Sequence, residues 1–213
     1  MNVKTSRQRT PQFPDFPNPQ LSFEILPCLG GTLRALPGWG AAVAEALARP
    51  GVPLPGGRSR GGAARVEAGG RSFVVRRARR GGALARLLPD LFLCPARFLA
   101  EQETAAAARA SAAPVAEVVG VWTRRRLVLL WEACVVTPYA EGEDLLALAR
   151  RGALPRGAET EAASAVAALA RARVLHADLH AGNLLWSVGE GPSGRVLVLD
   201  LDRARAGAAP GGA

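Results

Sequence analysis

Two acidic side chains and an amide in the last quarter of the sequence have the spacing of a phosphoryl-transfer site. Residues 176–183 read His-Ala-Asp-Leu-His-Ala-Gly-Asn, with Asp178 and Asn183 five residues apart. A further carboxylate, Asp200, follows the apolar run 196–199. Phosphoryl transfer needs a carboxylate near the acceptor hydroxyl and oxygen ligands for Mg²⁺. We therefore expect Asp178 to orient or deprotonate the hydroxyl, and Asn183 and Asp200 to bind the metal.

The same loop allows two other interpretations. Its polar residues could be ordinary loop side chains and Asp200 a turn residue, but an amphipathic helix is predicted before the loop, and apolar strands follow the loop and lead into Asp200. His176 and His180 are four residues apart, a spacing that would suit a metal pair on a helix. The aspartate and the glycine of this segment favour a loop instead. Phosphoryl transfer is the interpretation that fits best.

The first half of the chain predicts a sheet around one long helix. Residues 62–77 have the pattern of a strand, a Gly-Gly turn and a second strand, and residues 97–111 have the pattern of a helix. Short β-branched runs predict three further strands, at 115–121, 127–131 and 134–137. A polar turn is expected at Arg124-Arg125-Arg126, between the first two of these strands.

The second half predicts helices followed by a hairpin. Apolar periodicity indicates helices at 144–151 and 159–173, and a shorter helix near the start of the chain at 40–49. Strands are expected at 184–186 and 196–199, on either side of a Gly-Pro-Ser-Gly turn. The order of elements predicts an α+β chain with a strand-rich first part and a helix-rich second part.

The composition is that of a small basic globular protein. Its 213 residues fit one domain or two small lobes, and its net charge of +9 suggests an anionic partner. Charge alone does not distinguish nucleic acid, a phosphate-bearing ligand and an acidic membrane face. Nearly all of the positive charge comes from arginine, because Lys4 is the only lysine. A guanidinium fork binds phosphate well.

Neither an export signal nor a membrane span is expected. Residues 1–20 are polar and proline-rich, without the apolar core of a signal peptide. The longest apolar run is interrupted by Glu132 before it reaches the ~18 residues that a span requires. Cys28, Cys94 and Cys134 lack the spacing of metal ligands, and we expect buried thiols in a reducing compartment. The chain is therefore expected to be soluble or peripheral.

Six motifs spread over roughly residues 55–205 connect the chain to a known family. They are Val-Val-Arg-Arg-Ala-Arg-Arg-Gly-Gly at 74–82, Phe-Leu-Ala-Glu at 98–101, Ala-Pro-Val at 113–115, Val-Thr-Pro-Tyr-Ala-Glu-Gly at 136–142, the loop 176–183, and Leu-Asp-Leu-Asp at 199–202. With these motifs the chain resembles the Kdo kinase and lipopolysaccharide core kinase family, bacterial relatives of the protein kinases that use ATP to phosphorylate a sugar of lipopolysaccharide. The first motif points to this family rather than to kinases in general.

The resemblance implies a protein-kinase-like bilobal fold. We expect a disordered or loosely packed tail over residues 1–25, a β-rich N-lobe over 26–139 and a short helical C-lobe over 140–213. Relatives usually continue with further helices after the metal-binding aspartate, whereas this chain ends at Ala213. The resemblance therefore implies a truncated C-lobe.

The resemblance also assigns a cation for the nucleotide phosphates. Arg76 would contact the phosphates from a strand, where most kinases use lysine, and Glu101 would be its partner on the following helix. From the residues alone, Arg76 could equally be a surface arginine of the strand. Glu101 could be a solvated helix charge, and Glu103 is its rival for the pairing.

Two further segments are implied to contact the nucleotide. Arg60 and Gly61 belong to a Ser-Arg-Gly-Gly turn, which would be the glycine-rich cover over the phosphates, although a full Gly-x-Gly-x-x-Gly pattern is missing. Thr137 and Tyr139 would lie in the hinge that meets adenine.

The activity implied by the resemblance is transfer of a phosphoryl group from ATP to an alcohol, with Mg²⁺ as the metal. Asp200 would be the metal ligand and Asp202 an accessory, in an Asp-Leu-Asp motif that replaces the Asp-Phe-Gly of protein kinases. The thirteen residues after Asp200 are too few to dock a peptide, so the expected acceptor is a lipid-linked sugar, Kdo on lipid A. We expect an anionic membrane surface as a second partner, no nucleic acid, and a location at the cytoplasmic face of the inner membrane of a Gram-negative bacterium.

Two alternatives stay open. The chain could be a kinase-like phosphotransferase that acts on another small molecule or on a protein, because the motifs define the chemistry and not the acceptor. It could also be a pseudokinase or a basic binding module without turnover, as the short C-terminus and the absent strand lysine would allow. The intact Asp178, Asn183 and Asp200 argue against the second alternative.

Overall fold

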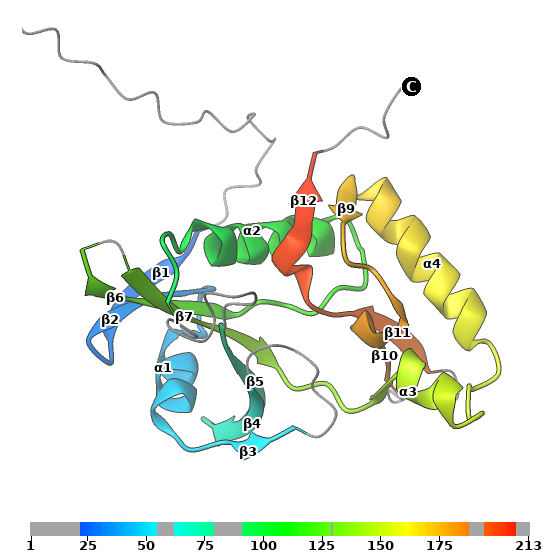
Figure 1. Ribbon diagram of the computed structural model, residues 1–213, viewed down its shortest axis with the longest axis horizontal. Coiled ribbons are helices and arrows are strands. Elements are labelled where there is room, and N and C mark those ends of the chain that lie inside the picture. Colours follow the sequence, from blue (N-terminus) through cyan, green and yellow to red (C-terminus); the bar gives the residue numbers. More distant parts are fainter. Residues whose placement is uncertain (1–21, 55–61, 79–90, 129, 188–193, 208–213) are drawn as a thin grey trace, which may run out of the picture.

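A seven-stranded antiparallel sheet forms the first part of the molecule (Figure 1). The computed structural model describes residues 22–54, 62–78, 91–128, 130–187 and 194–207. The strands lie in the order β1-β2-β6-β7-β5-β4-β3. Their bounds are β1 Glu24–Cys28, β2 Gly31–Ala35, β3 Val52–Pro53, β4 Ala63–Ala68, β5 Arg71–Arg77, β6 Gly120–Leu127 and β7 Leu130–Pro138.

One helix covers each face of this sheet, α1 (Gly40–Ala48) on one side and α2 (Ala96–Ala110) on the other (Figure 1). Successive residues of a strand point to opposite faces, and β7 shows the result. Val136 belongs to the core cluster under α1, whereas its neighbour Val135 belongs to the cluster under α2. Arg76 of β5 pairs with Val135, and this register directs the arginine towards α2.

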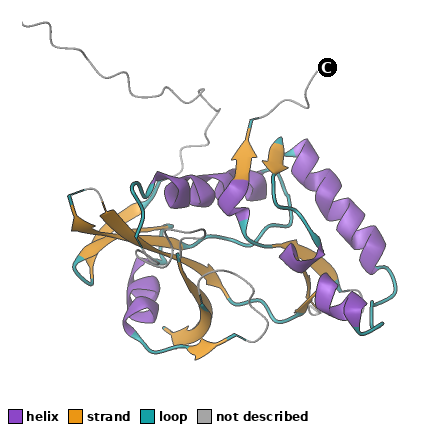
Figure 2. Cartoon of the chain, viewed as in Figure 1, coloured by secondary structure: helices purple, strands orange, loops and turns teal. Residues whose placement is uncertain are grey.

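The second part of the molecule carries the other helices and three short pairings of strands (Figure 2). The helices are α3 (Leu145–Arg150) and α4 (Ala158–Arg171), with single 3₁₀ turns η2 (Ala181–Asn183) and η3 (Leu201–Arg203). The strands are β8 (Glu143–Asp144), β9 (Val174–His176), β10 (Leu184–Ser187), β11 (Arg195–Val198) and β12 (Ala204–Ala206). β10 lies between β8 and β11, and β9 pairs with β12.

The segment between α2 and β6 connects the two parts of the molecule. Val115 forms a parallel bridge with Val198 at the end of β11. The amide of Ala116 donates to the Val198 carbonyl at 2.8 Å, and the Val198 amide donates to the Pro114 carbonyl at 2.7 Å. The α2-side core continues across this junction, because Val115, Val121 and Val198 belong to the same buried cluster.

The expected positions of the four helices are confirmed to within a few residues, but three details of the strands are wrong. The strands expected at 127–131 and 134–137 are not separate, because β7 runs unbroken over Leu130–Pro138 and Leu127 ends β6. The expected strand at 115–121 begins only at Gly120, because the residues before it pair with β11 instead. The expected turn at Arg124-Arg125-Arg126 lies inside β6. Glu132 of β7 forms ion pairs with Arg124 at 2.6 Å and Arg126 at 3.1 Å, and this cross-strand pairing makes the run compatible with a strand.

The hairpin of β1 and β2 was not foreseen. It begins at Glu24, inside the tail expected over residues 1–25, while residues 1–21 lie outside the described part of the chain. The expectation of buried thiols holds for Cys134 and is wrong for Cys94, which is exposed. In the described ranges, the helices all fall short of the length and apolarity needed to cross a bilayer.

Candidate active site

An ion pair between the sheet and α2 is the most buried polar contact of the site. Arg76 Nη2 of β5 donates to Glu101 Oε1 of α2 at 2.6 Å. The Glu101 side chain is 2% exposed and that of Arg76 is 19% exposed. The rival of Glu101, Glu103, is 53% exposed and contacts Arg34 instead. The structure therefore assigns the helix partner of Arg76 to Glu101.

Carboxylates outnumber guanidinium groups around this pair. The same nitrogen of Arg76 lies 3.3 Å from Asp200 Oδ1. Burial disfavours the charged form of Arg76, but Glu101, then Asp200 and Asp202, hold its pKa above the ordinary value. Burial raises the pKa of Glu101 to about 7, Arg76 opposes this rise, and the charges of Asp200 and Asp202 add to it. The surplus of negative charge favours the arrival of a cation.

Asp200 has an unusual backbone conformation. Its φ of 55° and ψ of 70° lie in the left-handed region, and it precedes η3. This conformation costs a residue with a side chain about 1 kcal/mol, although aspartate tolerates it better than most. Strain of this kind persists where the surroundings stabilise it. The ion pair of the Asp200 carboxylate with Arg76 is one such contact.

Backbone contacts join the loop 176–183 to the strand that carries Asp200. The Asn183 side chain donates through Nδ2 to the Asp178 carbonyl at 2.9 Å. The Asn183 carbonyl accepts from the Leu199 amide at 2.8 Å. His180 caps η2, since its Nδ1 accepts from the Gly182 amide at 3.0 Å. These contacts bring together Asp178, Asn183 and Asp200.

His176 connects the same two segments through its ring. Nδ1 accepts from the Asp178 amide at 3.3 Å, and Nε2 lies 3.3 Å from the Leu199 carbonyl. This pattern requires the tautomer with the proton on Nε2. The side chain of His176 is buried, and His180 makes a separate contact, so the two histidines do not form the metal pair that their spacing allowed.

The expected hinge, residues 137–139, spans the end of β7. Thr137 pairs with Val74 of β5, and the Tyr139 amide donates to the Ser72 carbonyl at 2.9 Å. The guanidinium of Arg65 lies 4.3 Å from the centre of the Tyr139 ring. These contacts hold the segment beside β5, the strand of Arg76. Arg60 and Gly61 lie outside the described residues.

Comparison with known proteins places this geometry in a family. A model described as the lipopolysaccharide kinase (Kdo/WaaP) family matches residues 46–210, which include every element of the site. The chain belongs to the lipopolysaccharide kinase (Kdo/WaaP) family. No curated protein matches the chain.

A solved structure shares the fold of this lipopolysaccharide kinase family member. It is described as WaaP in complex with acyl carrier protein, and it is 20% identical with a TM-score of 0.50. The match covers 76% of this chain, and the chain spans 64% of the length of that structure. The likeness confirms the α+β, kinase-like bilobal fold expected from the sequence.

The donor set fits a magnesium ion in this family member. Among the described residues, no three His, Cys, Asp or Glu side chains converge on one point, so a site made entirely of such protein ligands is absent from them. Asn183 uses Nδ2 as a donor, and its Oδ1 is the atom suited to a cation. One amide oxygen and the Asp200 carboxylate match the few protein ligands that Mg²⁺ takes when phosphate and water oxygens complete the octahedron.

The sequence did not predict the contacts of Arg97, which bind Asp202 to α2. Arg97, near the start of α2, lies 3.5 Å from Asp202 Oδ1, and its guanidinium stacks on the rings of Phe92 and Phe98 at 4.6 and 4.4 Å. The Asp202 side chain thus turns towards the helix. The only sequence signal for this contact was the second aspartate of the Asp-Leu-Asp motif.

Proposed function

We propose that this chain transfers the terminal phosphoryl group of ATP to a sugar hydroxyl of the lipopolysaccharide inner core, with Kdo linked to lipid A as the acceptor. One observation carries the proposal. The Glu101–Arg76 pair reaches Asp200, and Asp200 follows the residue that binds the loop of Asp178 and Asn183. The residues proposed to bind the phosphates, to hold the metal and to act on the hydroxyl are therefore connected to one another in the family-matched part of the chain.

Arg76 is the cation proposed for the nucleotide phosphates. Its guanidinium is held by Glu101 on one side and by Asp200 on the other, so it enters the reaction already oriented. Arg60 and Gly61 are proposed to cover the phosphates, and Thr137 and Tyr139 to contact adenine. Mg²⁺ held by Asn183 and Asp200 would neutralise charge on the phosphate oxygens.

Asp178 is proposed to act on the acceptor hydroxyl. Its side chain is exposed, and its backbone is held by His176 and Asn183. The sugar oxygen attacks the terminal phosphorus, the new oxygen–phosphorus bond forms as the bond to ADP breaks, and the hydroxyl proton passes to the Asp178 carboxylate. The contacts of the Asp178 backbone with His176 and Asn183 fix the position of this carboxylate, which supports attack of the hydroxyl in line with the leaving oxygen.

The net charge of the chain is compatible with this acceptor. Lipid A carries anionic groups and lies in a membrane surface, and a net charge of +9 favours both. We propose that the chain works at the cytoplasmic face of the inner membrane, as a peripheral protein that binds the lipid-linked sugar and the anionic surface rather than nucleic acid.

Transfer of label from γ-labelled ATP to Kdo-lipid A tests the proposal directly. The wild-type chain is expected to label the lipid, Asp178→Ala is expected to lose transfer, and Glu45→Gln on α1 is the matched carboxylate control that should retain it. Nucleotide binding without transfer to Kdo-lipid A would indicate another acceptor. Absence of nucleotide binding would overturn the kinase assignment altogether.

A further inference from the structure

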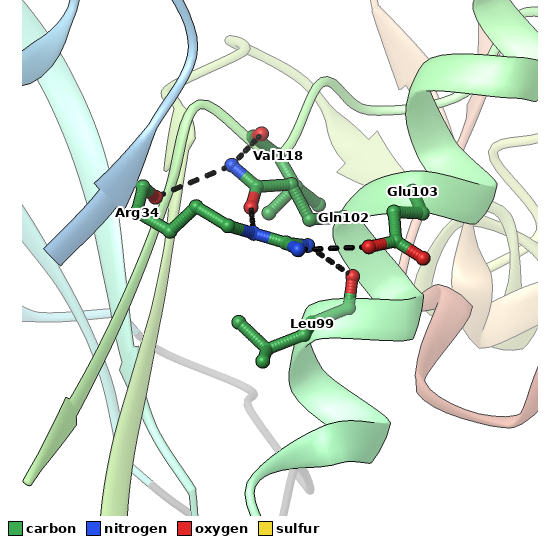
Figure 3. Close-up of polar contacts among 5 residues, drawn as sticks. All are labelled: Arg34, Leu99, Gln102, Glu103 and Val118. Atoms are coloured by element: carbon green, nitrogen blue, oxygen red, sulfur yellow. Dashed lines mark hydrogen bonds and ion pairs between the residues drawn. The ribbon is translucent and has the colours of Figure 1, made fainter. Parts of the chain in front are cut away.

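Arg34 of β2 binds α2, which covers one face of the sheet. The residue lies before residues 46–210, which the family model matches. Figure 3 shows the fan of contacts that it makes from β2. Its Nε donates to Gln102 Oε1 at 2.7 Å, its Nη1 to Glu103 Oε1 at 2.8 Å, and its Nη2 to the Leu99 carbonyl at 2.5 Å. One guanidinium thus binds a full turn of the helix.

Gln102 completes this connection from the helix side. The residue is fully buried, and its Nε2 donates to the Arg34 carbonyl at 3.4 Å and to the Val118 carbonyl at 3.2 Å (Figure 3). The amide oxygen accepts from the Arg34 side chain. The two residues, which we call the α2 anchor, therefore join the helix to β2 and to the segment that enters β6. Buried polar groups with all partners present hold a unique arrangement.

The buried face of α2 is partly polar. Its buried residues are Phe98, Ala105 and Ala108 together with the polar Glu101, Gln102 and Thr104, and each alanine buries little area. The helix contacts η3 and β12 of the second part of the molecule more extensively than it contacts β6. The α2 anchor therefore adds polar contacts that hold the helix to the sheet rather than to the second part.

Glu101 lies inside the anchored turn. It immediately precedes Gln102, and the Arg34 contacts at Leu99 and Glu103 lie two residues to either side of it. The Oε2 atom of Glu101 is buried with no hydrogen-bond partner among the described residues. Arg76 is the residue that binds the other oxygen. A shift of α2 would lengthen the contact between Glu101 and Arg76, so the geometry of this ion pair depends on what holds the helix.

We propose that Arg34 and Gln102 are positioning residues that hold Glu101 against Arg76 for phosphoryl transfer. The inference rests on the proposed function for its catalytic consequence, but the anchoring of α2 can be measured separately. It extends the functional part of the chain to the β1–β2 hairpin, before the first residue that the family model matches.

Hydrogen exchange and kinetics on the same variants test the inference. Arg34→Ala should speed amide exchange in α2 around residues 99–103, raise the KM for ATP about tenfold or more and lower kcat, as expected for the loss of charged hydrogen bonds. Arg34→Lys should recover part of both effects, because lysine keeps the charge but not the fork. The matched control is Arg49→Ala, which removes an arginine at the end of α1 that binds Glu45 of α1 and the Glu67 carbonyl of β4.

A double-mutant cycle separates positioning from general loss of stability. If Arg34 acts through Glu101, adding Arg34→Ala to Glu101→Gln should change kcat/KM little beyond the single Glu101→Gln variant. Independent effects that multiply would overturn the inference, as would exchange in α2 no faster than in Arg49→Ala. The wild-type chain could fail to bind nucleotide or transfer phosphate while Arg34→Ala still speeds exchange in α2. That result would overturn the proposed function and leave the α2 anchor in place.

Discussion

Glu101 binds Arg76 through one carboxylate oxygen at 2.6 Å and leaves the other buried without a hydrogen-bond partner among the described residues. The pair joins the helix that carries Glu101 to the strand that carries Arg76. Its burial and the neighbouring Asp200 and Asp202 place the pKa of Glu101 at about 7. The protonation of this one side chain therefore changes in the range where the protein would work.

Stability should fall with rising pH because of Glu101. Its pKa is about 4.5 in the unfolded chain and about 7 in the fold, so between these values the folded state binds more protons than the unfolded state. The contribution is complete below about pH 4.5 and is lost as pH rises through 7, with a total of about 3 kcal/mol. Urea unfolding of the wild type and of Glu101→Gln at several pH values measures it. The pH dependence of unfolding that Glu101 causes should be absent from Glu101→Gln, and Glu45→Gln should keep the pH dependence of the wild type.

Removing the guanidinium of the pair should weaken nucleotide binding. Arg76→Ala takes away the cation proposed for the phosphates and leaves a buried carboxylate, which should then become protonated rather than stay charged. We expect the dissociation constant of Mg·ATP to rise by about tenfold to a hundredfold, in line with a lost charged hydrogen bond. Arg76→Lys should recover part of the binding. Calorimetry with Mg·ATP measures it, and an unchanged affinity in Arg76→Ala would refute the assignment.

Much of this pair could be predicted from the sequence, because local patterns placed both of its residues. The Gly-Gly turn defined the strand of Arg76, and the periodicity of 97–111 defined the helix of Glu101. The choice between Glu101 and Glu103 could not be made, since both carboxylates belong to one helix. It needed the register that turns Arg76 towards α2.

The contacts that could not be predicted are those between distant segments. Arg34 and Gln102 are 68 residues apart, and no periodic pattern records such a contact. The role of His176 depends on the Leu199 carbonyl, 23 residues further along the chain. The arginine run at 124–126 led to the wrong prediction of a turn. A charge cluster favours a turn only when no partner faces it, and here Glu132 of the neighbouring strand faces it.

Asp178 should control turnover and not nucleotide affinity. Its exposed side chain makes no hydrogen bond within the described residues, so Asp178→Asn should leave the loop intact. We expect kcat to fall by about 10²- to 10⁴-fold, the usual contribution of a general base, with the dissociation constant of Mg·ATP within about twofold of wild type. Steady-state kinetics and calorimetry on one preparation measure both. A parallel loss of nucleotide binding would contradict the assigned role.

His176 should contribute to stability as well as to rate. His176→Ala leaves the Asp178 amide and the Leu199 carbonyl without their ring partner, at a cost of about 1–3 kcal/mol. The freed Leu199 carbonyl should also loosen the adjacent Asp200, so kcat should fall while the fold persists at low temperature. Thermal unfolding followed by circular dichroism, together with kinetics well below the transition, separates the two effects. The ring of His180 accepts a hydrogen bond from the Gly182 amide of its own loop, so His180→Ala should have a smaller effect on both.

In the described residues the backbone joins the two parts of the molecule at two places, and α2 adds its contacts with η3 and β12. One of these places is the chain that continues from Tyr139 into β8, and the other is the pairing of Pro114 and Ala116 with Val198. Because α2 binds β2 through Arg34 and contacts Asp202 of η3 through Arg97, it ties the sheet to the second part away from these two places. Sliding or twisting would require the Val198 hydrogen bonds to break. The contact of Arg76 with Asp200 at 3.3 Å crosses the same boundary, so a movement that separates the two parts would open this ion pair.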